Sequence, residues 1–352
     1  MFPQFIINRY ICISDKYILS IIRYSFISVT YAYLHRWQST ALISKRIHQR
    51  VLDKKRKLEG LRPLPSSLVA RLKKQMMIEY TYNSNAIEGN TLTLRETQLV
   101  IEEGMTVGGK SITETLEAKN HPEAIGFVEK LVDAKSGLTE DVILQLHKLI
   151  MSNITEDAGH YRTMGVRIAG ATFMPPPSSE VKPRMSELLK WLEENPDELT
   201  PIELAAVFHH RFVQIHPFSE GNGRTARLLM NALLMKDGYP FIAIVPKLDR
   251  LKYLKTLTEA DLGNISSLAN FMARCVERAL DMYLEALEEP EILTLAEASQ
   301  ISPYSQEYLS FMARKGLLGA FKQGRNWVVS KQELDRYLIS VRSKKRALPP
   351  SG

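Results

Sequence analysis

The sequence predicts a mainly α-helical protein that carries one short β-hairpin and ends in a small separate domain. Apolar residues recur at helical spacing through most of residues 44–288. A stretch rich in Gly, Thr and Val, closed by three consecutive prolines, interrupts that spacing at 159–180 and predicts the hairpin. The segment EEPEI at 288–292 separates a tail with a pattern of its own. The 352 residues suffice for one large and one small domain.

Composition sets the general class of protein. The chain is 45% hydrophobic and 24% charged, which is ordinary for a globular protein. Its two cysteines, Cys12 and Cys275, exclude a disulfide framework and a cysteine-rich zinc site. Two isolated cysteines suit a reducing compartment, so we expect a cytoplasmic protein.

The net charge of +7 originates in the first part of the chain, because residues 1–60 contain 11 Lys and Arg against 3 Asp and Glu. Residues 1–43 are rich in Ile, Tyr and Ser, and charged residues interrupt every apolar run before it reaches the ~20 residues of a membrane span. We place 1–43 outside the fold as an N-terminal extension and expect no membrane contact. An organellar presequence and a wrongly chosen start codon both stay open as explanations.

Helix boundaries follow from start and stop signals along the chain. The second helix ends at Gly89, and the third opens with the capping-box pair Thr93 and Glu96. We assign 44–120 to an N-terminal helical region and 121–288 to a core domain. Helices in that core are predicted at 121–135, 139–151, 182–194, 201–215, 221–237, 248–261 and 266–287.

The stretch HPFSEGNGRTAR, residues 216–227, follows the 201–215 helix and concentrates unusual side chains. Pro217 disfavours helix at His216, so the histidine lies at a helix exit. The glycine-rich turn that follows leads into a new helix, whose first N–H groups and dipole form an anion hole. The order of these features predicts a base beside an anion site.

Charged side chains flank this turn. Arg224 and Arg227 are three residues apart and share a helix face, where two guanidiniums suit a polyphosphate. Glu220 can hold Mg²⁺ at the mouth of the turn, because Mg²⁺ takes few protein ligands and keeps its waters. His216 can take the proton of an incoming hydroxyl. Together these groups predict phosphoryl-type chemistry.

The same stretch resembles the Fic family motif H-x-F-x-(D/E)-G-N-G-R-x-x-R with no position departing, and the resemblance extends over about residues 45–288. It implies the helical Fic fold with a β-hairpin flap. It also implies transfer of AMP from ATP to a Ser, Thr or Tyr hydroxyl of a target protein, with release of pyrophosphate. By this resemblance His216 is the catalytic base and Glu220 the Mg²⁺ ligand. The residues that would surround the phosphates are Gly221, Asn222, Gly223, Arg224, Thr225, Ala226 and Arg227.

Two further sets of residues follow from the resemblance. The flap would hold the target segment by main-chain pairing at Gly170, Ala171, Thr172 and Phe173. Tyr253 and Leu254 fall where relatives contact the nucleotide base. Relatives often have a second tyrosine in place of Leu254 and an Asn in place of Asp261, so base preference stays open. Relatives that transfer a phosphate carry a lysine in place of Gly223, and the glycine here favours nucleotide transfer.

A second motif lies upstream, where SNAIEGN resembles the family's inhibitory motif (S/T)-x-x-x-E-(G/N). Ser84 and Glu88 are one helical turn apart, and Gly89 ends the helix. By the resemblance Glu88 would pair with Arg227 and remove a γ-phosphate contact, because a carboxylate competes with a phosphate for one guanidinium. The protein would then inhibit itself. In some relatives this glutamate also aligns a water that removes AMP from the target.

Residues 291–340 resemble the small winged helix-turn-helix of excisionase- and MerR-like proteins, and a basic tail follows at 341–352. The second helix would enter the DNA major groove, and the wing, with Lys322 and Arg325, would touch phosphates. We expect Trp327 in the core of the wing. Modules of this class also dock proteins, so DNA and protein partners both stay open.

Three functions stay open on sequence alone. The first is a self-inhibited protein adenylyltransferase that uses ATP and Mg²⁺, and the second is a de-AMPylating hydrolase at the same site. The third is a DNA-binding regulator whose Fic domain only senses nucleotide. The set of His216, Glu220, Arg224 and Arg227 disfavours the third, because a sensor needs no base. The sequence leaves the target protein and homodimer formation open.

Overall fold

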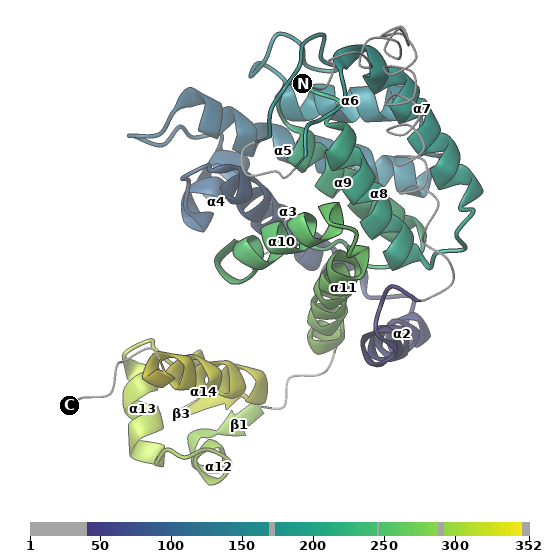
Figure 1. Ribbon diagram of the computed structural model, residues 1–352. Helices are drawn as coiled ribbons and strands as arrows, with labels where there is room; N and C mark the ends of the chain where they lie inside the picture. The colour runs from purple at the N-terminus through teal and green to yellow at the C-terminus, as the bar shows by residue number, and fades with distance from the viewer. Residues whose placement is uncertain (1–40, 169–172, 245, 288–291, 347–352) are drawn as a thin grey trace, which may run out of the picture. The chain divides into compact units, whose positions relative to one another are not determined.

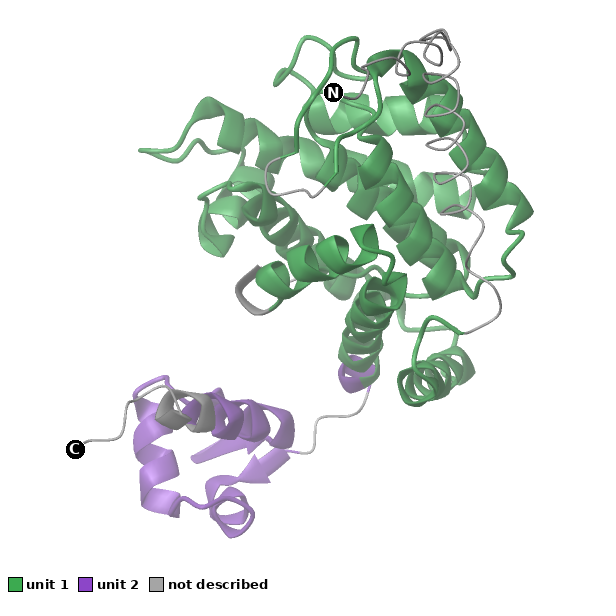
Figure 2. Ribbon diagram, viewed as in Figure 1, with its two compact units in different colours: residues 1–284 green, residues 285–352 purple. Residues whose placement is uncertain are grey.

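The computed structural model describes residues 41–168, 173–244, 246–287 and 292–346 (Figure 1). The chain divides into two compact units, residues 1–284 and 285–352 (Figure 2). The described part of the larger unit is helical, whereas the smaller unit combines helices with a three-stranded sheet. In these described ranges, no helix combines the length and the apolar character needed to cross a bilayer.

Helix α9, Asn222–Lys236, is the centre of the larger unit. It packs against α3 (Ser66–Glu88), α5 (Ile112–Asp133), α6 (Glu140–Met151) and α8 (Pro201–Ile215) (Figure 1). Almost all of its residues are buried, including two arginines, so their guanidiniums need partners inside the unit. The other helices in the described part of this unit are α2 (Lys45–Gly60), α4 (Leu94–Glu103), α7 (Ser178–Glu194), α10 (Pro246–Asp261) and α11 (Ile265–Leu287).

Predicted signals at the ends of α3 and α4 are confirmed. Thr93 and Glu96 form a complete capping box at the start of α4. Gly89 follows α3 with φ +105°, a left-handed conformation that favours glycine. The end of the upstream motif is therefore fixed by a helix stop.

Helix α5 begins at Ile112, well before the predicted start at 121. Ser111 and Glu114 form a second capping box, which the sequence analysis missed. Pro122 lies inside the helix, where it removes one backbone N–H donor. Packing of α5 against α6 and α9 keeps the helix continuous through this position.

The predicted β-hairpin is not found among the described residues. Residues 161–168 and 173–177 contain no strand, and the four residues between them lie outside the description. The guanidinium of Arg162 donates to the carbonyl oxygens of Met164 and Pro176. These carbonyls therefore have partners without a strand ladder, and the adjacent prolines have no N–H to donate to one.

The fold of the larger unit includes two residues that the sequence analysis placed in the extension. Leu42 and Ile43 are buried, and their backbone N–H groups donate to Oε1 of Glu203 at 2.7 and 3.0 Å. Glu203 also completes the capping box of α8. One buried carboxylate thus joins the start of the described chain to the helix that leads into the motif.

The smaller unit is a helix-turn-helix with an antiparallel sheet in the order β1-β3-β2. The predicted two-stranded wing is confirmed, with Ala320 opposite Val329, and a third strand, β1, was missed. Its second helix, α13, begins after Ser305, whose side chain caps the first turn. The elements are β1 (Ile292–Thr294), α12 (Leu295–Gln300), α13 (Gln306–Arg314), β2 (Ala320–Gln323), β3 (Asn326–Ser330) and α14 (Lys331–Arg346). The buried core consists of Leu293, Leu295, Ala298, Leu309, Ala313, Leu318, Val329 and Leu334.

Candidate active site

The loop between α8 and α9 places the predicted base beside the predicted anion hole. His216 ends α8 with φ +50°, and Gly221 precedes α9 with φ +75°, so both adopt the left-handed conformation. The amide of Asn222 accepts from the Phe218 N–H at 2.9 Å and donates to the Phe218 carbonyl at 2.8 Å. Thr225 donates from Oγ1 to the Gly221 carbonyl at 2.9 Å. Asn222 and Thr225 therefore hold the loop in shape.

His147 on α6 forms hydrogen bonds that hold the loop in place, a role that the sequence analysis missed. Its Nδ1 accepts from the Gly159 N–H at 2.9 Å, so the proton is on Nε2, which donates to the Glu220 carbonyl at 3.0 Å. The imidazole stacks on Phe218 with ring centroids 3.6 Å apart. Burial lowers the pKa of His147 to about 4, so it stays neutral. A Cβ at Gly221 would lie 2.7 Å from Sδ of Met151, and the left-handed φ of this residue also favours glycine.

His216 has the properties of a general base. Its Nδ1 is buried, so Nε2 is the nitrogen that can meet a substrate. Burial lowers the pKa of the imidazole, and the charge of Arg162 lowers it further. A hydrogen bond with the Val213 backbone and the negative charge of Glu88 raise the pKa. The net effect is a lowered pKa, so the ring is uncharged at neutral pH and can accept a proton.

Arg227 on α9 contacts both functional residues of the upstream motif. Its Nη2 donates to Oε1 of Glu88 at 2.7 Å and to the Ser84 carbonyl at 2.9 Å, and its Nε donates to Ser84 Oγ at 3.0 Å. Arg227 is 2% exposed and Glu88 is 36% exposed. Burial opposes ionisation of Glu88, but the charge of Arg227 outweighs it and lowers the pKa of the carboxyl. The contact inferred from the motif is thus an ion pair.

Gly223 gives Glu88 room to reach Arg227. A Cβ at position 223 would overlap Oε1 of Glu88 and lie 3.0 Å from Nη1 of Arg227. The glycine is thus compatible with the ion pair, and any larger residue there would push the carboxylate away. The sequence analysis linked Gly223 only to the choice of transferred group.

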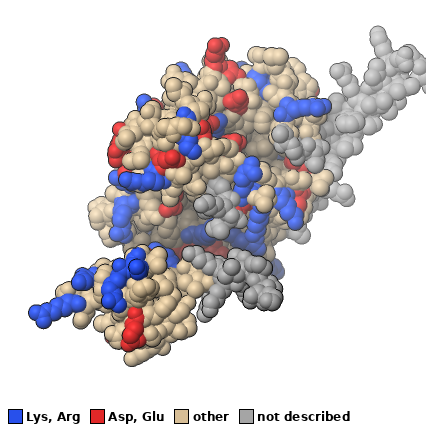
Figure 3. All heavy atoms as spheres, turned by 90° about the vertical axis from the view of Figure 1, so that its left-hand side faces the viewer, with Lys and Arg blue, Asp and Glu red and all other residues tan. Residues whose placement is uncertain are grey.

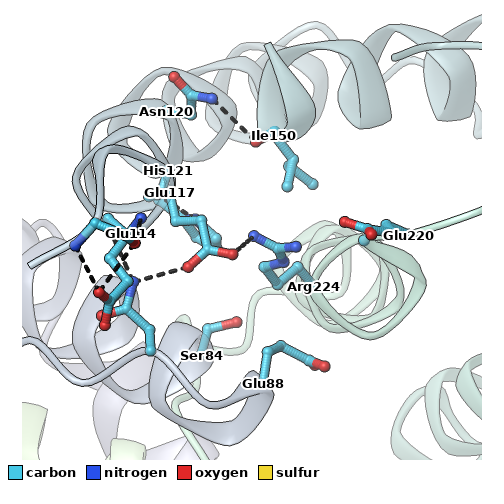
Figure 4. Close-up of polar contacts among 12 residues, drawn as sticks. Ser84, Glu88, Glu114, Glu117, Asn120, His121, Ile150, Glu220 and Arg224 are labelled. Carbon is cyan, nitrogen blue, oxygen red and sulfur yellow. Dashed lines mark hydrogen bonds and ion pairs between the residues drawn. The ribbon is translucent and has the colours of Figure 1, made fainter. Parts of the chain in front are cut away.

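Arg224 pairs with Glu117, a carboxylate on α5 that the sequence analysis did not single out (Figure 4). Its Nη1 donates to Oε1 of Glu117 at 2.8 Å. The other oxygen of Glu117 accepts from Nδ2 of Asn90 at 2.8 Å, and Asn90 directly follows the helix stop at the end of α3. Both motif arginines therefore contact carboxylates. Both carboxylates are connected to the C-terminal end of α3, Glu88 as its last residue and Glu117 through its hydrogen bond with Asn90. No local pattern could reveal this pair, because its partners are 107 residues apart.

Glu220 is suited to bind a hydrated cation. Its side chain is exposed, and it lies with Arg224 at the start of α9 (Figure 4). Across the described ranges, no three His, Cys, Asp or Glu side chains form a cluster that could enclose a metal ion. One exposed carboxylate nonetheless fits Mg²⁺, which keeps several waters and shares phosphate oxygens.

The remaining predicted contacts have different surroundings. Tyr253 is 2% exposed, and its hydroxyl lies 3.0 Å from Nε2 of His209. Leu254 is 39% exposed. Their contact with a nucleotide base stays a prediction. Among the predicted flap residues Phe173 is partly buried, and three lie outside the described residues: Gly170, Ala171 and Thr172.

Comparison with known proteins identifies the family. Residues 137–234 match the Fic/DOC family, and residues 292–341 match a helix-turn-helix domain. The crystal structure of a Fic domain containing signaling protein from Bacteroides thetaiotaomicron VPI-5482 is similar at 31% identity with a TM-score of 0.64. This similarity covers 67% of the present chain and 96% of that chain. The chain belongs to the Fic/DOC family.

Its relatives include named enzymes. Protein adenylyltransferase Fic from Nematostella vectensis is 39% identical over 246 residues, which are 68% of this chain and 57% of that protein. The same-named protein from Drosophila persimilis is 37% identical over 257 residues, 72% of this chain and 50% of that protein. A structure of Fic-1 (aa134–508) from C. elegans is 26% identical, with a TM-score of 0.61, over 78% of this chain and 79% of that chain. The chain is thus homologous to a nucleotidyltransferase and spans about half the length of the curated relatives it matches.

Proposed function

We propose that this chain is a self-inhibited protein adenylyltransferase that transfers AMP from ATP to a Ser, Thr or Tyr hydroxyl of a target protein. The observation that carries the proposal is the arrangement of one loop. It holds a neutral imidazole, His216, next to a helix N-terminus that carries two buried arginines, Arg224 and Arg227. A base, an anion hole and two guanidiniums are the groups that nucleotidyl transfer requires.

The chemistry needs one proton transfer and one exchange at phosphorus. The target oxygen bonds to the α-phosphorus, the bond from that phosphorus to the β-phosphate oxygen breaks, and pyrophosphate leaves with the electron pair. Nε2 of His216 takes the hydroxyl proton. The N–H groups at the start of α9 and both arginines orient the phosphates and balance their charge. Mg²⁺ bound by Glu220 would neutralise further phosphate charge.

Self-inhibition follows from the ion pair between Glu88 and Arg227. The carboxylate occupies the donors that would otherwise bind a terminal phosphate. Activity then requires Glu88 to leave Arg227. We call the contacts of Ser84 and Glu88 with Arg227 the latch.

A hydrolase that removes AMP from the target is the alternative reaction at this site. It is supported by the 36% exposure of Glu88, whose carboxylate reaches solvent while one oxygen stays on Arg227. A partly exposed carboxylate can orient a water as well as block a phosphate. In this alternative Glu88→Gly abolishes AMP removal from a modified target.

The test compares three proteins, using ATP labelled at the α-phosphate: the unmodified chain, Glu88→Gly, and Glu88→Gly combined with His216→Ala. We expect label in protein for Glu88→Gly, weak label for the unmodified chain and none for Glu88→Gly combined with His216→Ala. Glu103→Gly is the matched control, because Glu103 also ends a helix and is followed by a left-handed glycine. If Glu88→Gly incorporates no more label than Glu103→Gly, the transferase proposal is wrong.

We propose further that the smaller unit contacts DNA phosphates through its wing. Lysine and arginine side chains gather on the face of this unit drawn in Figure 3. Lys322 on β2 lies 5.8 Å from the ring of Trp327, and Trp327 packs against the core. The measurement is binding of a mixed-sequence duplex over a salt series, where Arg325→Gln should reduce the log–log slope by about 1. Affinity that does not change with salt would instead favour a protein partner.

A further inference from the structure

One guanidinium gathers backbone carbonyls around the proposed base. Arg162 is 4% exposed, and its Nε donates to the His216 carbonyl at 2.8 Å. Its Nη1 donates to Met164 O at 2.8 Å, and its Nη2 to Pro176 O at 2.6 Å and Ile215 O at 3.4 Å. Among the described residues no carboxylate pairs with this guanidinium. Its partners are therefore carbonyls from the end of α8 and from two other stretches of the chain.

The C-terminal end of α8 stabilises the positive charge of Arg162. The last carbonyls of a helix have no partner within the helix, and the helix dipole makes that end negative. The guanidinium of Arg162 donates to the Ile215 and His216 carbonyls, and the backbone N–H of Arg162 donates to the Pro217 carbonyl at 3.0 Å. These bonds secure the turn in which His216 takes its left-handed conformation. The buried charge is thus stabilised by oriented dipoles in place of a counter-ion.

We propose that Arg162 is a positioning residue for the reaction: it fixes the backbone of His216, ties it to Met164 and Pro176, and places a permanent positive charge near the imidazole. This inference rests on the proposed function. Two charges face the ring, Arg162 from the loop after α6 and Glu88 from the end of α3. The charge of Arg162 lowers the pKa of His216, and the charge of Glu88 raises it. The neutral base is therefore favoured by Arg162, and it is favoured further when the Glu88 carboxylate moves away from the ring.

Two variants separate geometry from charge, both made in the Glu88→Gly protein. Arg162→Lys keeps the charge, but one ammonium cannot reach four carbonyls with the planar geometry of a guanidinium. Arg162→Met keeps much of the length and removes the charge. Arg184→Met is the control, because the side chain of Arg184 on α7 is 40% exposed and, among the described residues, forms an ion pair with Glu180 one turn away. The readouts are kcat, KM for ATP, thermal unfolding and the pH dependence of kcat.

We expect both variants to lower kcat by about 10- to 100-fold with little change in KM for ATP, because the base is displaced and the phosphate contacts are not. Arg162→Met should also move the acid limb of the pH profile to higher pH, by about half a unit or more. The sign follows because loss of a nearby positive charge makes protonation of His216 easier. Arg162→Lys should leave that limb in place. A folded Arg162→Met with unchanged kcat, or equal limb shifts in both variants, would overturn the inference.

A second measurement separates this inference from the proposed function. The His216 ring signal is titrated by NMR in the same proteins and identified by its loss in His216→Ala. If the Glu88→Gly protein transfers no AMP, the proposed function fails, yet the titration still tests Arg162. A higher pKa of His216 in Arg162→Met and an unchanged one in Arg162→Lys support the positioning role. Identical titrations in all forms refute it.

Discussion

Replacing Glu88 with glutamine removes the charge of the latch and keeps the size of the side chain. Nη2 of Arg227 lies 2.7 Å from Oε1 of Glu88, and Arg227 is 2% exposed. An amide oxygen can still accept from Arg227, so the change weakens the contact and leaves the helix end of α3 in place. Glu88→Gly, in contrast, removes the whole side chain.

The size of the effect follows from the exposure of the two partners. A hydrogen bond to a charged group contributes about 1.5–3 kcal/mol in proteins. Glutamine keeps a hydrogen bond to Arg227, and water screens Glu88, which is 36% exposed, so the substitution removes only part of this energy, about 1 kcal/mol. This free energy corresponds to about a fivefold change in the fraction of molecules with Arg227 free. If ATP needs free Arg227, its apparent Kd falls by about the same factor.

The assay is calorimetric titration of each protein with a non-hydrolysable ATP analogue and Mg²⁺ at neutral pH. Glu103→Gln is the control at the equivalent position of α4. The pKa of Glu88 is lowered by Arg227, so the latch is fully present above about pH 4.3, the usual glutamate value, and is lost as pH falls through the lowered value. The difference in Kd should therefore be constant between about pH 6 and 8. Equal Kd values for the unmodified chain and Glu88→Gln would refute the latch as a barrier to ATP.

Three further changes have defined outcomes. Gly223→Ala places a methyl group against the Glu88 carboxylate and displaces it. This change should raise AMP transfer severalfold when Glu88 is present and should give no gain in the Glu88→Gly background. A gain in both backgrounds contradicts the steric argument. Asn90→Ala removes the link between Glu117 and the end of α3, worth about 1 kcal/mol, and should raise transfer about fivefold only while the latch is intact. Leu309→Ala, in the core of the smaller unit, should lower its unfolding free energy by about 2–5 kcal/mol, measured by hydrogen exchange of the 292–346 amides; unchanged protection would contradict the assigned core.

Local signals in the sequence predicted most of the described helices and the motif. Capping residues such as Thr93 and Glu96, and the stop at Gly89, act within a few residues of one another. The turn that begins at Gly221 is also a local signal, because its glycines and the helix that they precede are adjacent in sequence. The helix-turn-helix pattern also followed from nearby residues.

Two other local predictions differ from the described structure. The hairpin was expected from Val, Thr and Gly, but in the described residues Arg162 supplies the partners that a strand ladder would have supplied. The early start of α5 was missed because Pro122 is a helix-breaking signal, whereas packing of α5 against α6 and α9 keeps the helix continuous through it.

The sequence by itself determined that the proposed base, the turn and the two arginines lie together, because all of them fall within twelve positions of one chain segment. Only the tertiary structure decided what each arginine contacts. Glu88 reaches Arg227 from 139 residues away, and Glu117 reaches Arg224 from 107. The physical reason is that α9 is buried on nearly every side, so its guanidiniums must find acceptors on whichever helices pack around it. Those acceptors are set by packing, and sequence spacing alone does not encode them.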